Sequence, residues 1–184
     1  WQSGRFEIAT EHDETWTFAL LGSLDDCQNA QTPETGNGLW ALTQCINDKQ
    51  IDLVLPDSIG SVLLSTSEGL EHCRVFSNRT TKLDIRDASD LEHLEVFGAG
   101  ANISFTACPS LSCIDGPEEV QDQTKLALHH GSGASTGLRL NMPFTEVMIA
   151  DSAIPRLAML TASSLKLYRC YFLLRLNVPR GCDV

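Results

Sequence analysis

The feature that most constrains the fold is an internal repeat with a period of about 21 residues. One set of positions returns 21 residues later, where Leu70, Cys73, Val75 and Phe76 are followed by Leu91, Leu94, Val96 and Phe97. A second set has nearly the same period and comprises Val62 and Leu64, Leu83 and Ile85, and Ile103 and Phe105. A fixed period of this length indicates stacked units that share one apolar core.

Each unit contains two short segments in which apolar and polar residues alternate, such as Leu94-x-Val96 and Ile103-x-Phe105. Alternation with a period of two predicts strands with one buried face, and glycine, proline and asparagine between the segments predict tight corners. Two helices do not fit into 21 residues, whereas two strands and two corners do. We therefore predict a β-rich solenoid, a leucine-rich-repeat-like stack of about six short coils with parallel sheets, over residues 51–184.

The repeat is less regular in the C-terminal third. Its equivalent positions there are Leu126 and Leu128, then Val147 and Ile149, then Leu165 and Leu167. The spacing of Pro109, Leu111 and Ile114 also matches that of Pro155, Leu157 and Leu160. This match predicts that Leu160 occupies the place of Ile114 in its coil.

Residues 1–50 carry no repeat and contain all three tryptophans. Within 38–49, Leu39, Leu42, Cys45 and Ile46 have helical spacing. We interpret 1–50 as an N-terminal cap region with an amphipathic helix that covers the first coil of the solenoid. The alternative is the end of a separate domain that lies mostly upstream, since the chain opens at Trp1 and reads as a fragment or a processed form.

The net charge of -11 is unevenly distributed. Residues 1–122 contain 6 basic and 21 acidic residues, whereas 123–184 contain 7 basic and 3 acidic ones. This balance argues against nucleic acid as a partner, because binding to phosphates needs a concentrated basic surface. A basic surface on another protein is the expected partner, and no apolar stretch is long enough to span a membrane.

The seven cysteines contain no Cys-x-x-Cys pair, which argues against a zinc ribbon and a disulfide framework. We interpret them as buried thiols in a reducing compartment. Residues 11–14 (Glu-His-Asp-Glu) are interpreted as a solvated acidic loop, and His129-His130 as part of a surface loop. The sequence therefore predicts no metal site, no cofactor and no catalytic residue.

The phrase Leu70-x-x-Cys73-x-Val75-x-x-Asn78 resembles the leucine-rich-repeat signature, in which an asparagine or cysteine follows the strand. Short repeats of this length are similar to those of bacterial leucine-rich-repeat proteins, which include surface proteins and effectors delivered into host cells. The resemblance covers about residues 60–175 and departs from the pattern at Ala99 and Glu119. It implies a secreted protein-recognition module of a larger bacterial protein, with a host protein as the partner.

Stacked coils align equivalent outward residues into a ribbon that a partner can contact. We predict that the binding face comprises Glu71, His72, Arg74, Glu92, His93 and Glu95. Two other functions fit a β-solenoid. One is a parallel β-helix enzyme that acts on polysaccharide through paired outward carboxylates. The other is a structural adhesin repeat domain.

Overall fold

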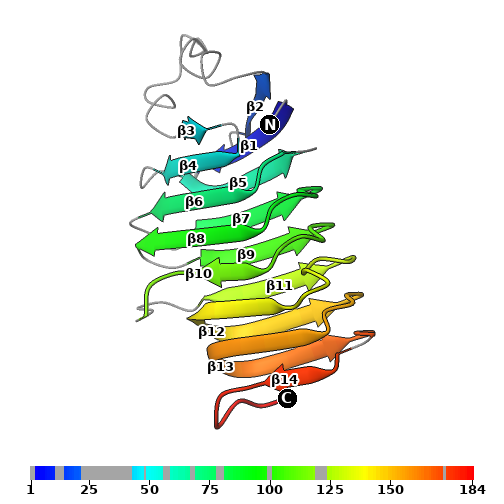
Figure 1. Cartoon of the computed structure of the whole chain (residues 1–184). Helices are drawn as coiled ribbons and strands as arrows, with labels where there is room; N and C mark the ends of the chain where they lie inside the picture. The colour runs from blue at the N-terminus through cyan, green and yellow to red at the C-terminus, as the bar shows by residue number, and fades with distance from the viewer. Residues whose placement is uncertain are drawn as a thin grey trace.

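The protein is a stack of β-strand coils along one axis, with the strands of successive coils side by side (Figure 1). The computed structural model describes residues 3–10, 15–21, 43–47, 49–55, 59–66, 69–77, 81–98, 101–118, 124–171 and 173–184. Within these ranges it contains fourteen strands and no helix. None of the described segments therefore forms a helix that is long and apolar enough to cross a bilayer.

Two faces of parallel strands form the solenoid. The first sheet contains, in order, β4 (Gln50–Leu55), β6 (His72–Ser77), β8 (His93–Gly98), β10 (Cys113–Asp115), the start of β12 (Leu138–Ala150), the start of β13 (Arg156–Tyr168) and β14 (Arg175–Asn177). The second sheet contains β5 (Ile59–Thr66), β7 (Thr81–Arg86), β9 (Ala101–Thr106), β11 (Lys125–His129) and the ends of β12 and β13. The long strands β12 and β13 run through both sheets and join them.

The pairing register confirms the predicted solenoid with parallel sheets, although it makes about five turns rather than the predicted six. In the first sheet Cys73 pairs with Leu94, and Leu94 pairs with Ile114. In the second sheet Leu83 pairs with Ile103. The looser C-terminal repeat is confirmed as well, because the partners Leu126–Val147 and Val147–Leu165 lie in one row.

The inward side chains of both sheets form one hydrophobic core. Leu94, Phe105 and Leu111 are completely buried, and β6 alternates strictly between half-buried and buried residues. Each coil is too thin to bury its own apolar face, so every inward residue is covered by its equivalents above and below. Complete burial of one such side chain stabilises the fold by about 1.5–3 kcal/mol.

The position predicted for Leu160 is wrong by one residue. Ile114 pairs with Leu140, and Leu140 pairs with Met159 rather than with Leu160. Met159 is buried, whereas the Leu160 side chain is 52% exposed. The reason is that Leu157 already lies within β13, and the next inward residue of a strand comes two positions later.

A repeated corner ends the strands of the second sheet. The residue after the strand has a positive φ in five successive coils, at Asp87, Ala107, His130, Asp151 and Arg169. A buried or half-buried small residue follows within two positions. In four of the five coils its side chain donates to a backbone carbonyl of the strands, and the donors are Cys108, Ser132, Ser152 and Cys170. Cys108 Sγ lies 3.6 Å from the Ile85 oxygen and Cys170 Sγ lies 3.3 Å from the Ile149 oxygen. These two thiols therefore have a structural role in the corners.

Antiparallel strands lie at the N-terminal end of the stack. β1 (Ser3–Thr10) pairs with β2 (Thr15–Leu21) and with β5, and β3 (Thr43–Asn47) pairs with β4. Half of the segment 38–49 lies outside the described residues, so the helical cap stays a prediction, and 43–47 within the described half forms β3. Pairing with β3 and β1 satisfies backbone groups along the N-terminal edges of β4 and β5.

Candidate functional site

The outward face of the first sheet carries two adjacent rows of polar side chains. The first row runs through Gln50, His72, His93, Cys113 and Arg139. The second row runs through Asp52, Arg74, Glu95, Asp115 and Asn141. We call these residues the outward ladder. Because adjacent parallel strands lie about 4.8 Å apart, side chains at paired positions of adjacent coils are close enough to form hydrogen bonds and ion pairs.

All six residues of the predicted binding face lie at this face or directly before its strands. His72 is the register partner of His93, and Arg74 is the partner of Glu95. Glu71 and Glu92 precede β6 and β8, and the Glu92 amide donates to the Glu71 carbonyl over 2.9 Å. Of the six side chains only that of Glu92 is exposed, while the others are half-buried.

Several of these charges are neutralised within the protein. Arg74 binds Asp52 through two contacts, Nε to Oδ1 at 2.7 Å and Nη2 to Oδ2 at 2.5 Å. Hydrogen bonding to Asp52 raises the pKa of Arg74, which keeps the guanidinium charged. Lys49 Nζ forms an ion pair with Glu71 at 2.5 Å. Arg74 and Glu71 are therefore engaged in contacts between coils before any partner binds.

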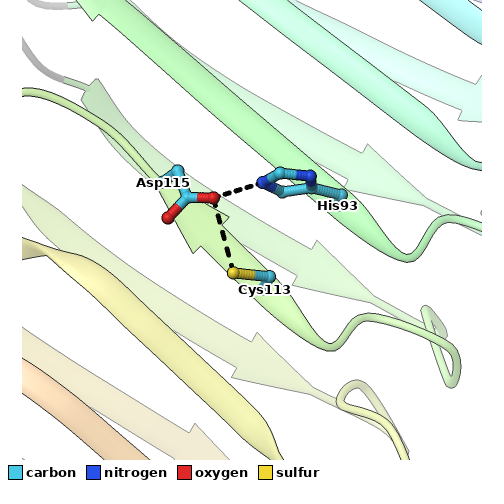
Figure 2. A group of neighbouring side chains, drawn as sticks. All are labelled: His93, Cys113 and Asp115. Atoms are coloured by element: carbon cyan, nitrogen blue, oxygen red, sulfur yellow. Dashed lines mark hydrogen bonds and ion pairs between the residues drawn. The ribbon is translucent and has the colours of Figure 1, made fainter.

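At the centre of the outward ladder, His93, Cys113 and Asp115 form a compact cluster that we did not predict (Figure 2). His93 Nε2 lies 2.5 Å from Asp115 Oδ2, and Cys113 Sγ donates to the same oxygen over 3.5 Å. Asn141 Nδ2 donates to the other oxygen, Oδ1, over 2.7 Å. One carboxylate thus connects a thiol and an imidazole from adjacent strands.

The electrostatics of the cluster do not resemble those of an activated nucleophile. Burial, followed by the charge of Asp115, raises the pKa of Cys113 to about 11, so the thiol is protonated at neutral pH. In a thiol protease the histidine lies between the cysteine and the acid. Here Asp115 lies between His93 and Cys113, which does not suit nucleophilic catalysis.

Asp115 is also a poor proton donor for hydrolysis of a polysaccharide. Burial raises its pKa, but hydrogen bonds from Asn141, His93 and Cys113 outweigh this effect and leave the pKa below its usual value. A general acid of a glycosidase needs a raised pKa. Asp115, whose register partner is the carboxylate Glu95, therefore lacks the raised pKa that a general acid needs in the polysaccharide-enzyme alternative.

The remaining candidate residues lie elsewhere. Residues 11–14 are outside the described ranges. His129 ends β11 and His130 follows it at an exposed corner with a φ of 51°, and the centroids of the two rings are 6.3 Å apart. His130 thus lies in the repeated corner, in agreement with its interpretation as part of a surface loop.

The charge of the outward face changes sign along the solenoid. Toward the C-terminus, a groove of about 820 Å³ is lined by three exposed arginines, Arg139, Arg156 and Arg175. These residues come from β12, β13 and β14, whereas Glu92 and Glu95 lie at β8. The uneven charge of the sequence therefore appears as an acidic and a basic section of one surface.

Comparisons with protein-family models, with curated proteins and with solved structures find no match to this chain. A functional interpretation consequently depends on the geometry of the outward ladder.

Proposed function

We propose that this chain is a leucine-rich-repeat-like recognition module that binds a basic segment of another protein, as part of a larger bacterial effector or surface protein. The observation that carries the proposal concerns the ion pairing of the Glu92 and Glu95 carboxylates. Among the described residues, neither glutamate forms an ion pair with a lysine or arginine, in contrast to Asp52 and Glu71. Two carboxylates at the middle of a rigid face are therefore available to a cationic partner.

The backbone of the face supports this role. β6 and β8 pair over their whole lengths. The inward side chains of these strands, such as the completely buried Leu94, anchor the face to the hydrophobic core. Positions fixed in this way lose little conformational entropy on binding, so modest contacts give useful affinity. Opposite charges across the interface add specificity and a faster association rate.

The proposal is tested with a random peptide library displayed on phage and selected against the chain. We expect the recovered peptides to be rich in lysine and arginine. A synthetic copy of one peptide is then titrated into the wild type, into Glu92→Gln/Glu95→Gln and into the control Asn102→Lys/Thr106→Lys. Both double variants raise the net charge by two, but the control residues lie on β9 in the second sheet.

We expect Glu92→Gln/Glu95→Gln to weaken binding at least fivefold at low salt, whereas the control changes it by less than twofold. The contribution comes from charge pairs at the surface, so the difference shrinks as the salt concentration rises. Failure to recover a binding peptide, or equal affinity of both double variants, contradicts the proposal.

A further inference from the structure

We infer that His93, Cys113 and Asp115 form a binding site for Zn²⁺, or for a divalent transition metal of similar chemistry, on the outward face of the first sheet. The three ligand atoms lie within 4.8 Å of one another. This inference goes beyond the proposed recognition function and does not depend on it. It rests on the donor atoms, their spacing and the groups that hold them.

The donor set is one that zinc prefers. Zinc in proteins binds cysteine sulfur, histidine nitrogen and carboxylate oxygen, and this cluster offers one of each. A thiolate and an imidazole do not suit Ca²⁺ or Mg²⁺, which bind through oxygen. The chemistry of the three side chains therefore selects a borderline or soft divalent ion.

The spacing is close to what a tetrahedral ion needs. Bond lengths of about 2.0–2.3 Å to zinc place neighbouring ligand atoms roughly 3.3–3.6 Å apart. Cys113 Sγ and Asp115 Oδ2 are already 3.5 Å apart. His93 Nε2 and Asp115 Oδ2, at 2.5 Å, form a hydrogen bond that has to open by roughly 1 Å. Small side-chain rotations provide this movement, because both residues lie on the solvent side of the sheet.

Strand pairing fixes the ligands in position. Cys113 is the register partner of His93 on the adjacent strand, and Asp115 follows Cys113 by two residues on the same face. All three ligands thus come from two short strands whose backbones are held by the solenoid. A site of this kind exists in the folded chain and does not need a loop to close around the ion.

Neighbouring groups orient the ligands as they do in known metal sites. Asn141 donates to Asp115 Oδ1, which leaves Oδ2 directed at His93 and Cys113. The other nitrogen of His93, Nδ1, lies 3.8 Å from a Glu95 carboxylate oxygen. In known metal sites a hydrogen bond from this second nitrogen to a carboxylate orients the ring and increases its basicity, and Glu95 is the carboxylate positioned to accept one once this distance shortens. The His72 ring packs edge-on against His93 at 5.7 Å and further restricts it.

The charges of the bound state balance. Binding transfers the Cys113 proton to solvent, and the resulting thiolate together with the Asp115 carboxylate neutralises a divalent cation. The remaining charges beside the site, Glu95 and Arg139, have opposite signs. Three protein ligands leave a fourth position open on the solvent side, where water or a donor from a partner binds.

The test uses the whole chain, freed of metal with a chelator, and Zn²⁺ in competition with a chromophoric chelator. We expect one equivalent of Zn²⁺ to bind, with the affinity reduced at least tenfold in Cys113→Ser, His93→Gln and Asp115→Asn. Matched controls are Cys182→Ser and His130→Gln, which lie outside the cluster and retain wild-type affinity. Titration with Co²⁺ adds a thiolate-to-cobalt absorption band, which disappears in Cys113→Ser.

A measurement on the wild type removes any dependence on the folding of variants. Alkylation followed by peptide mass mapping gives the rate for each cysteine with and without Zn²⁺. We expect Zn²⁺ to slow alkylation of Cys113 at least tenfold and to leave that of Cys182 unchanged. The inference is overturned if the wild type binds no stoichiometric Zn²⁺, if Cys113→Ser binds it as tightly, or if Zn²⁺ protects Cys182 as strongly as Cys113. None of these readouts involves a protein partner, so they are independent of the peptide test.

Discussion

Two leucine-to-alanine substitutions test the register of the solenoid directly. Leu94 is completely buried in β8, between Cys73 and Ile114 of the adjacent coils. Leu160 lies in β13 and is 52% exposed. The two substitutions remove the same atoms, so any difference in stability comes from the environments that the structure assigns to them.

The expected magnitudes follow from burial. Replacing a buried leucine by alanine removes about 2.4 kcal/mol of transfer free energy, at about 0.8 kcal/mol for each of three carbon groups. The cavity left between neighbouring coils adds to this loss, and the range observed for buried leucines is about 2–5 kcal/mol. For Leu160 only about half of the transfer term applies and no cavity forms. We therefore expect a loss of about 3–4 kcal/mol for Leu94→Ala and of about 1 kcal/mol for Leu160→Ala.

Urea unfolding followed by far-ultraviolet circular dichroism measures both free energies, because the signal reports the strands of all coils. The tryptophans are unsuitable as the main probe, since all three lie in the first 40 residues. Equal losses for the two variants, or a larger loss for Leu160→Ala, would show that β13 is shifted by one residue. A loss below about 1 kcal/mol for Leu94→Ala would refute the shared core itself.

Two further predictions concern an ion pair of the outward ladder and a thiol of the core. Arg74→Met leaves the buried Asp52 carboxylate without its partner, so we expect the free energy of unfolding to fall by roughly 1–3 kcal/mol, and a change below about 0.5 kcal/mol in urea unfolding would contradict this. Burial, and secondarily the charge of Asp52, raises the pKa of Cys73 from its usual 9.0 to about 12. The unfolded chain then loses this proton at lower pH than the folded chain, so stability present below pH 9 declines toward pH 12, by up to about 1.4 kcal/mol per pH unit. We expect Cys73→Ala to flatten this decline in urea unfolding at several pH values, and an unchanged slope would argue against a buried thiol.

The sequence was sufficient to predict the rows of the core because most coils have nearly equal lengths. A shift of 20 or 21 residues aligns Cys73, Leu94 and Ile114, and alternation decides which side chains point inward. The prediction was wrong at Leu160, because it aligned Pro155 with Pro109 and assumed that equal spacing after the proline leads to the same face of the strand. Leu111 precedes its strand, β10, whereas Leu157 lies within β13, so the same spacing leads to different faces.

The helical cap near the N-terminus stays a prediction, because half of the segment 38–49 lies outside the described residues. Apolar residues at intervals of three and four in 38–49 match one face of a helix, but part of this segment is the strand β3. A short segment contains too few apolar residues for their period to distinguish the two structures. Within the described residues, backbone pairing with β4 holds 43–47 as the strand β3, and the local pattern does not encode that pairing.

The cluster at the centre of the outward ladder was only partly accessible from the sequence. The 20-residue shift that aligns Leu94 with Ile114 also aligns His93 with Cys113, so their proximity was predictable. The contact between His93 and Asp115 is different, because the register partner of Asp115 is Glu95. That diagonal contact depends on side-chain rotamers, which the repeat does not specify.

Strand parity separates the cysteines, which we first treated as one group. Cys73 occupies an inward position and is completely surrounded by the core, so its thiol acts as a small apolar side chain. Cys113 directly precedes the inward Ile114 and must therefore point outward, where it meets a carboxylate and an imidazole. The same residue type thus stabilises the core at one position and offers a metal ligand at another. Only the register of the strands, and not the cysteine count, distinguishes the two roles.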